Sequence, residues 1–263
     1  MTYQNLRIER DGEVCFLLID RPQKKNALSP STLNELCAAA NAADADASVR
    51  VIVISGHGDS AFSAGFDLSE LQQAGRPGRP GEESAIVEEA YSVIRQLRKP
   101  VIAMINGVVM GAATDLLSNC DFRFAAEEAR IAIPPAKLGI LYSWEGTRRF
   151  VQLVGPANAK DLFMTGRTIT AAEALAMGLV QRVVPRARLR EVTLAYAREL
   201  ASGAPLSVAG AKRMIDRLLA AHMPSDEDIK ALRALQAEVW ASEDAKEGPR
   251  AFLEKRRPDF KGR

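Results

Sequence analysis

Compact apolar runs alternate with amphipathic segments over the first two thirds of the chain. Three of these runs, at Val14–Asp20, Val51–Ser55 and Pro100–Ile105, are bounded by turn residues, which is typical of buried strands. The segments 30–44 and 83–98 place apolar residues at helical spacing. The same pattern predicts strands at 122–125, 130–133 and 179–184, and helices at 66–73, 112–119, 144–154 and 171–177.

Local signals mark where several helices begin, and only helices are expected near the end of the chain. Ser29 precedes Pro30, and Thr170 with Glu173 has the spacing of a capping box. From Arg188 onward the pattern predicts helices at 190–202, 205–221, 226–242 and 245–255. We therefore expect an α/β core over residues 1–190 and a helical region over 191–263, with Gly- and Pro-rich 75–81 as a surface loop.

Composition excludes several classes of protein. Hydrophobic residues make up 47% and charged residues 26% of the 263 residues, as in ordinary globular domains. The net charge of only +2 argues against a nucleic-acid partner. Three cysteines without CxxC spacing predict neither a zinc site nor a disulfide framework. Because neither an apolar leader nor a stretch long enough to span a bilayer is present, we expect a cytoplasmic protein without membrane contact.

Two segments share one local pattern, in which a buried strand leads into a turn of small residues and then a helix. They are Ser55–Leu68 and Ile105–Leu116. Small residues allow a ligand to approach the backbone, and two amides that converge there could form an oxyanion hole. Tight packing alone explains the same residues equally well. Neither segment has the spacing of a dinucleotide-binding loop, a P-loop or a Gly-x-Ser-x-Gly nucleophile elbow.

These segments belong to an ordered set of motifs that resembles the crotonase superfamily, the enoyl-CoA hydratase/isomerase family. The set spans nearly the whole chain and comprises Asp20–Leu28 (DRPQKKNAL), Ala61–Leu68 (AFSAGFDL), Lys99–Gly107 (KPVIAMING), Leu138–Gly139, Gly166–Ala174 (GRTITAAEA), Gly178–Val180 and Ala251–Arg256 (AFLEKR). The resemblance implies a spiral of β-β-α units with a C-terminal helical region that forms trimers, often stacked as hexamers. It also implies an acyl-CoA substrate and no cofactor beyond the coenzyme A moiety.

The resemblance also assigns backbone donors. The amides of Phe66 and Ala112 stand where the family stabilises the oxygen of a thioester enolate. Ala112 replaces the usual glycine, but a backbone donor does not depend on its side chain. Loss of one such donor typically costs about 3–4 kcal/mol.

The acid and base residues depart from the family pattern. Hydratases of the family hold a water between two glutamates, and the matching positions here are Asp115 and Pro135. Asp115 is one methylene shorter than glutamate, and Pro135 cannot transfer a proton. For Asp115, a catalytic role and a role at the helix N-terminus stay open as equal alternatives.

The loop after Gly139 offers two further candidates. Glu145 lies two residues beyond the position of the single acid in isomerases of the family, but its position favours a solvated or N-terminal helix glutamate over a catalytic base. Tyr142 matches a tyrosine of the methylmalonyl-CoA decarboxylases that meets the substrate carboxylate, and it fits equally a packing role. Those decarboxylases carry a histidine where this chain has Phe66.

Five residues are expected to bind coenzyme A. By resemblance Lys25 contacts the phosphates, Ala27 and Ala64 line the channel, and Phe252 and Lys255 reach the coenzyme from the C-terminal region. Lys255 could instead belong to a solvated basic tail.

Three functions compete on this sequence. A hydratase or double-bond isomerase of enoyl-CoA leads, because it is the general activity that the resemblance implies. Decarboxylation of a malonyl-type CoA is an alternative supported by Tyr142 and Pro135. A weakly catalytic CoA-binding scaffold is the third, because one of the usual acids is missing.

Overall fold

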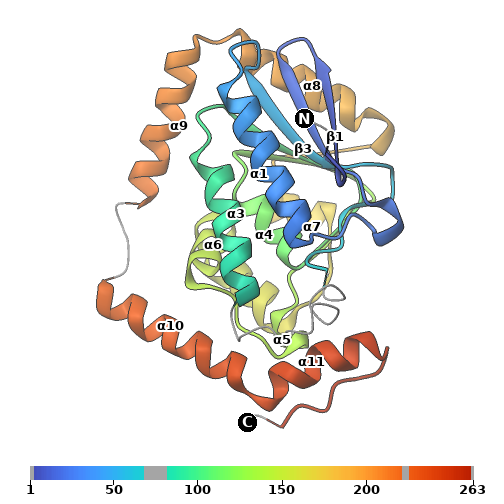
Figure 1. Ribbon diagram of the computed structural model, residues 1–263, viewed down its shortest axis with the longest axis vertical. Coiled ribbons are helices and arrows are strands. Elements are labelled where there is room, and N and C mark those ends of the chain that lie inside the picture. Colours follow the sequence, from blue (N-terminus) through green and yellow to red (C-terminus); the bar gives the residue numbers. More distant parts are fainter. Residues whose placement is uncertain (1–2, 68–81, 221–224, 262–263) are drawn as a thin grey trace.

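The computed structural model describes residues 3–67, 82–220 and 225–261, which form a two-sheet α/β body with helices around it (Figure 1). The strands are β1 (Leu6–Asp11), β2 (Val14–Ile19), β3 (Val51–Gly56), β4 (Ala61–Ser63), β5 (Val101–Ile105), β6 (Val108–Met110), β7 (Phe122–Ala126), β8 (Arg130–Ala132), β9 (Ile169–Thr170) and β10 (Arg182–Val184). The helices are η1 (Pro22–Lys24), α1 (Pro30–Ala45), α3 (Glu82–Gln96), α4 (Ala112–Ser118), α5 (Pro135–Leu138), α6 (Trp144–Thr165), α7 (Ala171–Ala176), α8 (Arg186–Ser202), α9 (Pro205–Ala220), α10 (Asp226–Ala241) and α11 (Glu243–Leu253).

The strands form two sheets that the chain visits in turn. One sheet has the order β1-β2-β3-β5-β7-β10 and the other β4-β6-β8-β9. The pairs β3 and β4, β5 and β6, and β7 and β8 each supply one strand to each sheet before a helix follows. These are the expected β-β-α units, so the α/β spiral architecture is confirmed.

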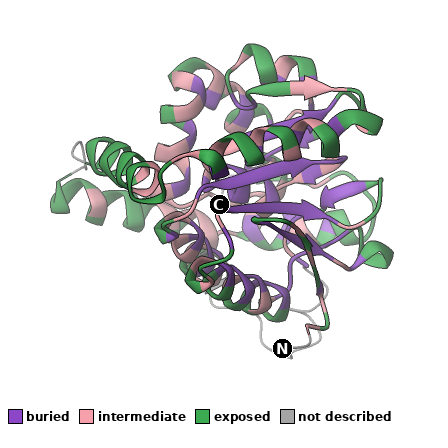
Figure 2. Ribbon diagram, turned by 90° about the horizontal axis from the view of Figure 1, so that it is seen from above, coloured by how far each residue is buried: buried purple, intermediate pink, exposed green. Residues whose placement is uncertain are grey.

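The strands of the larger sheet are apolar throughout because both of their faces are covered. Within β2, Cys15, Leu17 and Ile19 face the core beneath α1, α3 and α4. Val14, Phe16 and Leu18 face the second core, which α8 covers with Leu189 and Ala197. A strand buried on both faces reads as a continuous apolar run, and the buried strands are visible in Figure 2.

Several boundaries differ from the sequence-based expectation. The strand expected at 179–184 is limited to β10, and the helix expected at 144–154 continues through a kink at Gly155 to Thr165. The helix expected at 66–73 does not begin at Phe66, because this residue forms a bridge with Leu28. Residues 68–73 of the expected helix lie outside the described residues, and so does the expected loop 75–81. The expected division after residue 190 falls within α8, and the domain organisation stays a prediction.

The last helices are mostly exposed in the single chain. Helices α9 and α10 contain no buried residue and project from the body (Figure 2). Among helices of the described residues, none combines the length and the apolar character that crossing a bilayer requires.

Candidate active site

The two turns of small residues lie against each other in the structure. Gly65 has φ +93°, and a Cβ at this position would lie 2.6 Å from the carbonyl oxygen of Met110 and 3.6 Å from the amide nitrogen of Ala112. Only glycine permits this approach, because any side chain would displace the second turn. This contact joins the turn that carries Phe66 to the turn that carries Ala112. Within the described part of the chain, neither amide donates a hydrogen bond.

A third segment supports these turns. In the loop 21–28, the side chain of Asn26 donates to the carbonyl oxygens of Ala61 (2.8 Å) and His57 (3.1 Å). Two backbone bonds, from Ala64 to the carbonyl of Lys25 (2.9 Å) and from Leu28 to that of Gly65 (2.7 Å), join the loop to the first turn. The motif Asp20–Leu28 is therefore part of the framework of the site.

These turns form one wall of a cavity of about 780 Å³. Of the residues predicted from the sequence, Phe66, Ala112, Asp115 and Tyr142 line it, and so do Lys25, Ala27, Ala64 and Phe252. The cavity is mainly apolar, which is the usual character of a small-molecule site. The structure therefore brings eight of the ten predicted site residues to one cavity.

The other two predicted residues lie elsewhere in the single chain. Glu145 lies in the first turn of α6, 3.7 Å from Arg233 of α10, an ion-pair contact outside the cavity lining. Lys255 is exposed beyond the end of α11. Pro135 is buried as the first residue of α5, and its neighbour Pro134 lines the cavity in its place.

Asp115 supplies a carboxyl group to this cavity from a nearly dry position. The residue is only 3% exposed, and its Oδ1 accepts a hydrogen bond from Ser118 (3.0 Å). Burial raises the pKa of the Asp115 carboxyl, Arg149 opposes the rise, and the charge of Glu88 adds to it. A buried carboxyl that holds its proton at higher pH is suited to general acid–base chemistry.

The charge of Asp115 acts on two tyrosines, Tyr91 and Tyr142. Burial, and then the charge of Asp115, raises the pKa of Tyr142 well above its usual value, so its phenol stays protonated. Tyr91, which is fully buried, donates a hydrogen bond to the carbonyl oxygen of Ala112 (2.6 Å) and so fixes the second turn from behind.

Several residues of the site were not predicted from the sequence. Glu88 lines the cavity, and its two oxygens accept hydrogen bonds from Arg149. Trp240 also lines the cavity and donates a hydrogen bond to the carbonyl oxygen of Leu141 (2.9 Å). Glu88 and Arg149 lie in helices, where a charged residue usually predicts a solvent-exposed face. No local sequence signal therefore distinguishes them from ordinary surface residues.

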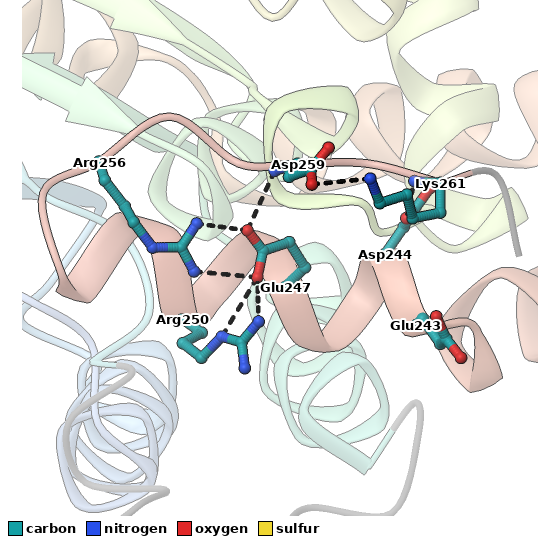
Figure 3. Close-up of a pocket in the computed structure, with 7 residues that line it drawn as sticks. All are labelled: Glu243, Asp244, Glu247, Arg250, Arg256, Asp259 and Lys261. Carbon is teal, nitrogen blue, oxygen red and sulfur yellow. Dashed lines mark hydrogen bonds and ion pairs between the residues drawn. The ribbon is translucent and has the colours of Figure 1, made fainter.

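The C-terminal tail folds back on α11 around one buried glutamate (Figure 3). Glu247 binds the side chains of Arg250 and Arg256, and it accepts a hydrogen bond from the Asp259 amide at 3.0 Å. Lys261 pairs with Asp259 at 2.7 Å. Arg256 and Lys261, two cations of the C-terminal tail, thus form ion pairs with Glu247 and Asp259. Phe252 and Leu253 line the large cavity.

Comparison with known proteins gives a consistent result. The model of the enoyl-CoA hydratase/isomerase family matches residues 9–263. The chain is 37% identical over 265 residues to a probable enoyl-CoA hydratase of Rhizobium meliloti, covering 100% of both chains, and 37% identical to a crotonyl-CoA hydratase of Syntrophomonas wolfei, covering 99% of both. A solved structure of methylmalonyl-CoA decarboxylase is similar with a TM-score of 0.92, 30% identity and 100% coverage of both chains.

Proposed function

Because the chain belongs to the enoyl-CoA hydratase/isomerase family and acts on an acyl-CoA thioester, we propose that it catalyses a reaction of the hydratase/isomerase type in which Asp115 moves a proton at the acyl chain. The observation that carries this proposal is the burial of Asp115 in the wall of the cavity, which raises the pKa of its carboxyl group. A carboxyl group with a raised pKa can serve as a general acid as well as a general base.

The amides of Phe66 and Ala112 stabilise the enolate in this proposal. When a proton is removed from the carbon beside the thioester carbonyl, or when water adds to the conjugated double bond, negative charge develops on the carbonyl oxygen, and protonation of that carbon then discharges it. These two amides have no acceptor within residues 3–67, 82–220 and 225–261, and the packing of Gly65 against Met110 fixes the two turns that carry them, so they are preorganised to bind that oxygen. The hydrogen bond of Tyr91 to the Ala112 carbonyl supports the second donor from behind.

Tyr142 is the second polar group of the reaction. A Cβ at Gly111 would lie 3.8 Å from its hydroxyl oxygen, so the phenol lies close to the second turn. Because its proton is retained, the hydroxyl can donate to a water or to an oxygen of the acyl group. Pro135 has no side-chain group that could transfer a proton, and Glu145 lies outside the cavity lining. Asp115 is therefore the proton-transfer group in our proposal.

Coenzyme A occupies the outer part of the cavity in this proposal. Lys25 supplies charge for a phosphate, Ala27 and Ala64 provide close backbone approach, and Phe252 provides an apolar surface. Lys255, exposed outside the lining, is available to a phosphate at the rim. The proposed reaction needs no cofactor beyond the coenzyme A moiety of the substrate.

Decarboxylation of a malonyl-type thioester is the second candidate. The similarity to methylmalonyl-CoA decarboxylase and the position of Tyr142 favour it. Against it stands Asp115, a carboxyl-bearing residue of the lining that would disfavour a further carboxylate beside it.

A panel of thioesters separates these reactions. We expect the purified protein to convert crotonyl-CoA or a 3-enoyl-CoA, with products resolved by mass spectrometry, and to leave methylmalonyl-CoA unchanged. Loss of carbon dioxide from methylmalonyl-CoA as the only turnover would replace our proposal by the second candidate. Micromolar CoA binding without turnover of any thioester would favour the scaffold function.

We also propose that the chain assembles as a homotrimer or a hexamer in the cytoplasm. Large apolar side chains of α9 and α10 are exposed in the single chain, among them Leu206 at 89% and Met214 at 66%. Such a surface is typical of an interface. All three cysteines are unpaired, which suits a reducing compartment. Light scattering should give three or six times the 28.5 kDa chain mass, and a monomer would contradict the assembly.

A further inference from the structure

A partly buried ion-pair cluster adjoins Asp115. The Nη1 and Nη2 atoms of Arg149 donate to the two oxygens of Glu88 at 3.1 and 2.9 Å, which is a parallel, bidentate pair. The same Nη2 lies 3.3 and 3.4 Å from the two oxygens of Asp115. The hydrogen bonds of Arg149 are therefore better formed toward Glu88 than toward Asp115. Toward Asp115, a single nitrogen of Arg149 makes a longer contact that is shared between the two carboxylate oxygens.

The other polar and titratable groups near Asp115 come from its own helix α4, from α3 and from the loop before α6. Ser118 of the same helix donates to its Oδ1 and accepts from the Nε of Arg149 (3.1 Å). From α3 come Glu88 and Tyr91, and the loop before α6 contributes Tyr142. Within residues 3–67, 82–220 and 225–261, Arg149 is the one cation paired with Asp115.

A second arginine holds Glu88 in place. Arg95, one helix residue from the end of α3, donates to Glu88 Oε1 at 2.8 Å and to the Asn119 side chain at 2.5 Å. Burial opposes ionisation of Glu88, but the bonds and charges of Arg149 and Arg95 outweigh it and lower the pKa of this carboxyl. Glu88 is therefore a fixed anion, and its charge is directed at Arg149 rather than at substrate.

We propose that Glu88 and Arg149 are a positioning pair for Asp115, in which Glu88 engages the guanidinium and leaves the Asp115 carboxyl able to exchange a proton with the substrate. This inference rests on the proposed function, in which Asp115 moves the proton. A guanidinium bound to Asp115 alone would favour the ionised carboxylate strongly in so dry a position. Two anions that share one guanidinium weaken that preference.

The two partners should act on Asp115 in opposite directions. Glu88→Gln removes the competing anion, so the pKa of Asp115 falls. Arg149→Gln removes the cation, so the pKa of Asp115 rises. Glu88→Gln keeps the size of the side chain, and Arg149→Gln is shorter but still carries an amide that can form a hydrogen bond. A general loss of structure cannot produce opposite signs.

The experiment is the pH dependence of kcat/KM on the thioester that the protein converts fastest. The part of this pH profile to follow is the titration step that disappears in Asp115→Asn. We expect its midpoint to move to lower pH by about 1 pH unit in Glu88→Gln and to higher pH by about 1 in Arg149→Gln. Glu89→Gln, which removes the same charge from the exposed neighbouring position on α3, should leave the midpoint in place. The double variant Glu88→Gln/Arg149→Gln should return it toward the wild-type position.

Two results would overturn the positioning role of Glu88 and Arg149, and both can be told apart from a failure of the proposed function. An unmoved midpoint in a folded, active Glu88→Gln, or movement in the same direction in both single variants, removes the positioning role while Asp115 keeps its own. If Glu88→Gln does not fold, the upward movement in Arg149→Gln decides alone. A titration step that persists in Asp115→Asn instead refutes the proposed function itself.

Discussion

Replacement of Asp115 by asparagine is expected to lower kcat about 10³-fold, because a positioned acid–base group contributes about 10²–10⁴-fold. Asparagine keeps the size of the side chain and an oxygen that can accept from Ser118 and Arg149, so the cavity wall should stay in place. The measurement is steady-state turnover of the best thioester, with CoA-ester affinity measured separately. We expect the affinity to change little, because the coenzyme lies in the outer part of the proposed site.

Glu145→Gln is the matched control, since it tests the other candidate acid of the sequence. Glu145 lies outside the cavity lining near Arg233, so we expect kcat close to that of the wild type. The assignment of the acid would be reversed if Glu145→Gln lost turnover and Asp115→Asn retained it.

Gly65→Ala is expected to damage both stability and turnover. The residue has φ +93°, and the added Cβ would lie 2.6 Å from the Met110 carbonyl oxygen. The backbone conformation costs about 1–2 kcal/mol for a residue with a side chain. Forcing apart the packed turns adds about 1–3 kcal/mol. Because the Phe66 and Ala112 amides would separate, kcat should also fall about 10²–10³-fold.

Gly58→Ala separates the two causes of this effect. Gly58 has φ +83°, but a Cβ there would meet nothing within 4 Å. Thermal unfolding and turnover of both variants should show that Gly58→Ala incurs the backbone cost alone and keeps its kcat. Equal losses of turnover in the two variants would contradict the role that we give to the contact between the turns.

The sequence predicted the parts of the fold in which local pattern and tertiary packing agree. Strands β2 and β3 carry uninterrupted apolar runs because both faces are buried, and the Thr170–Glu173 capping box forms as expected. Strands β4 and β6 were missed, because each has three residues and is defined by pairing with the other across two turns. Strand β1 was missed because it is an edge strand with a largely exposed pattern.

The site was predictable where a motif fixes the backbone and not where distant side chains meet. Phe66, Ala112 and Asp115 follow small-residue turns, and the structure places all three in one cavity. The Glu88–Arg149 pair joins α3 to α6, and nothing in either helix marks its charge as buried. Only the three-dimensional arrangement reveals that Asp115 shares its cation.

The central claim is that Asp115 moves a proton at the carbon next to a thioester carbonyl that two backbone amides polarise. The most direct measurement is deuterium incorporation at this carbon when the protein turns over, in deuterium oxide, the thioester that it converts fastest, followed by mass spectrometry. We predict incorporation at the rate of turnover by the wild-type protein and about 10³-fold slower incorporation by Asp115→Asn, with CoA-ester binding retained. Incorporation at the wild-type rate by Asp115→Asn, or none by the wild-type protein, would contradict this account.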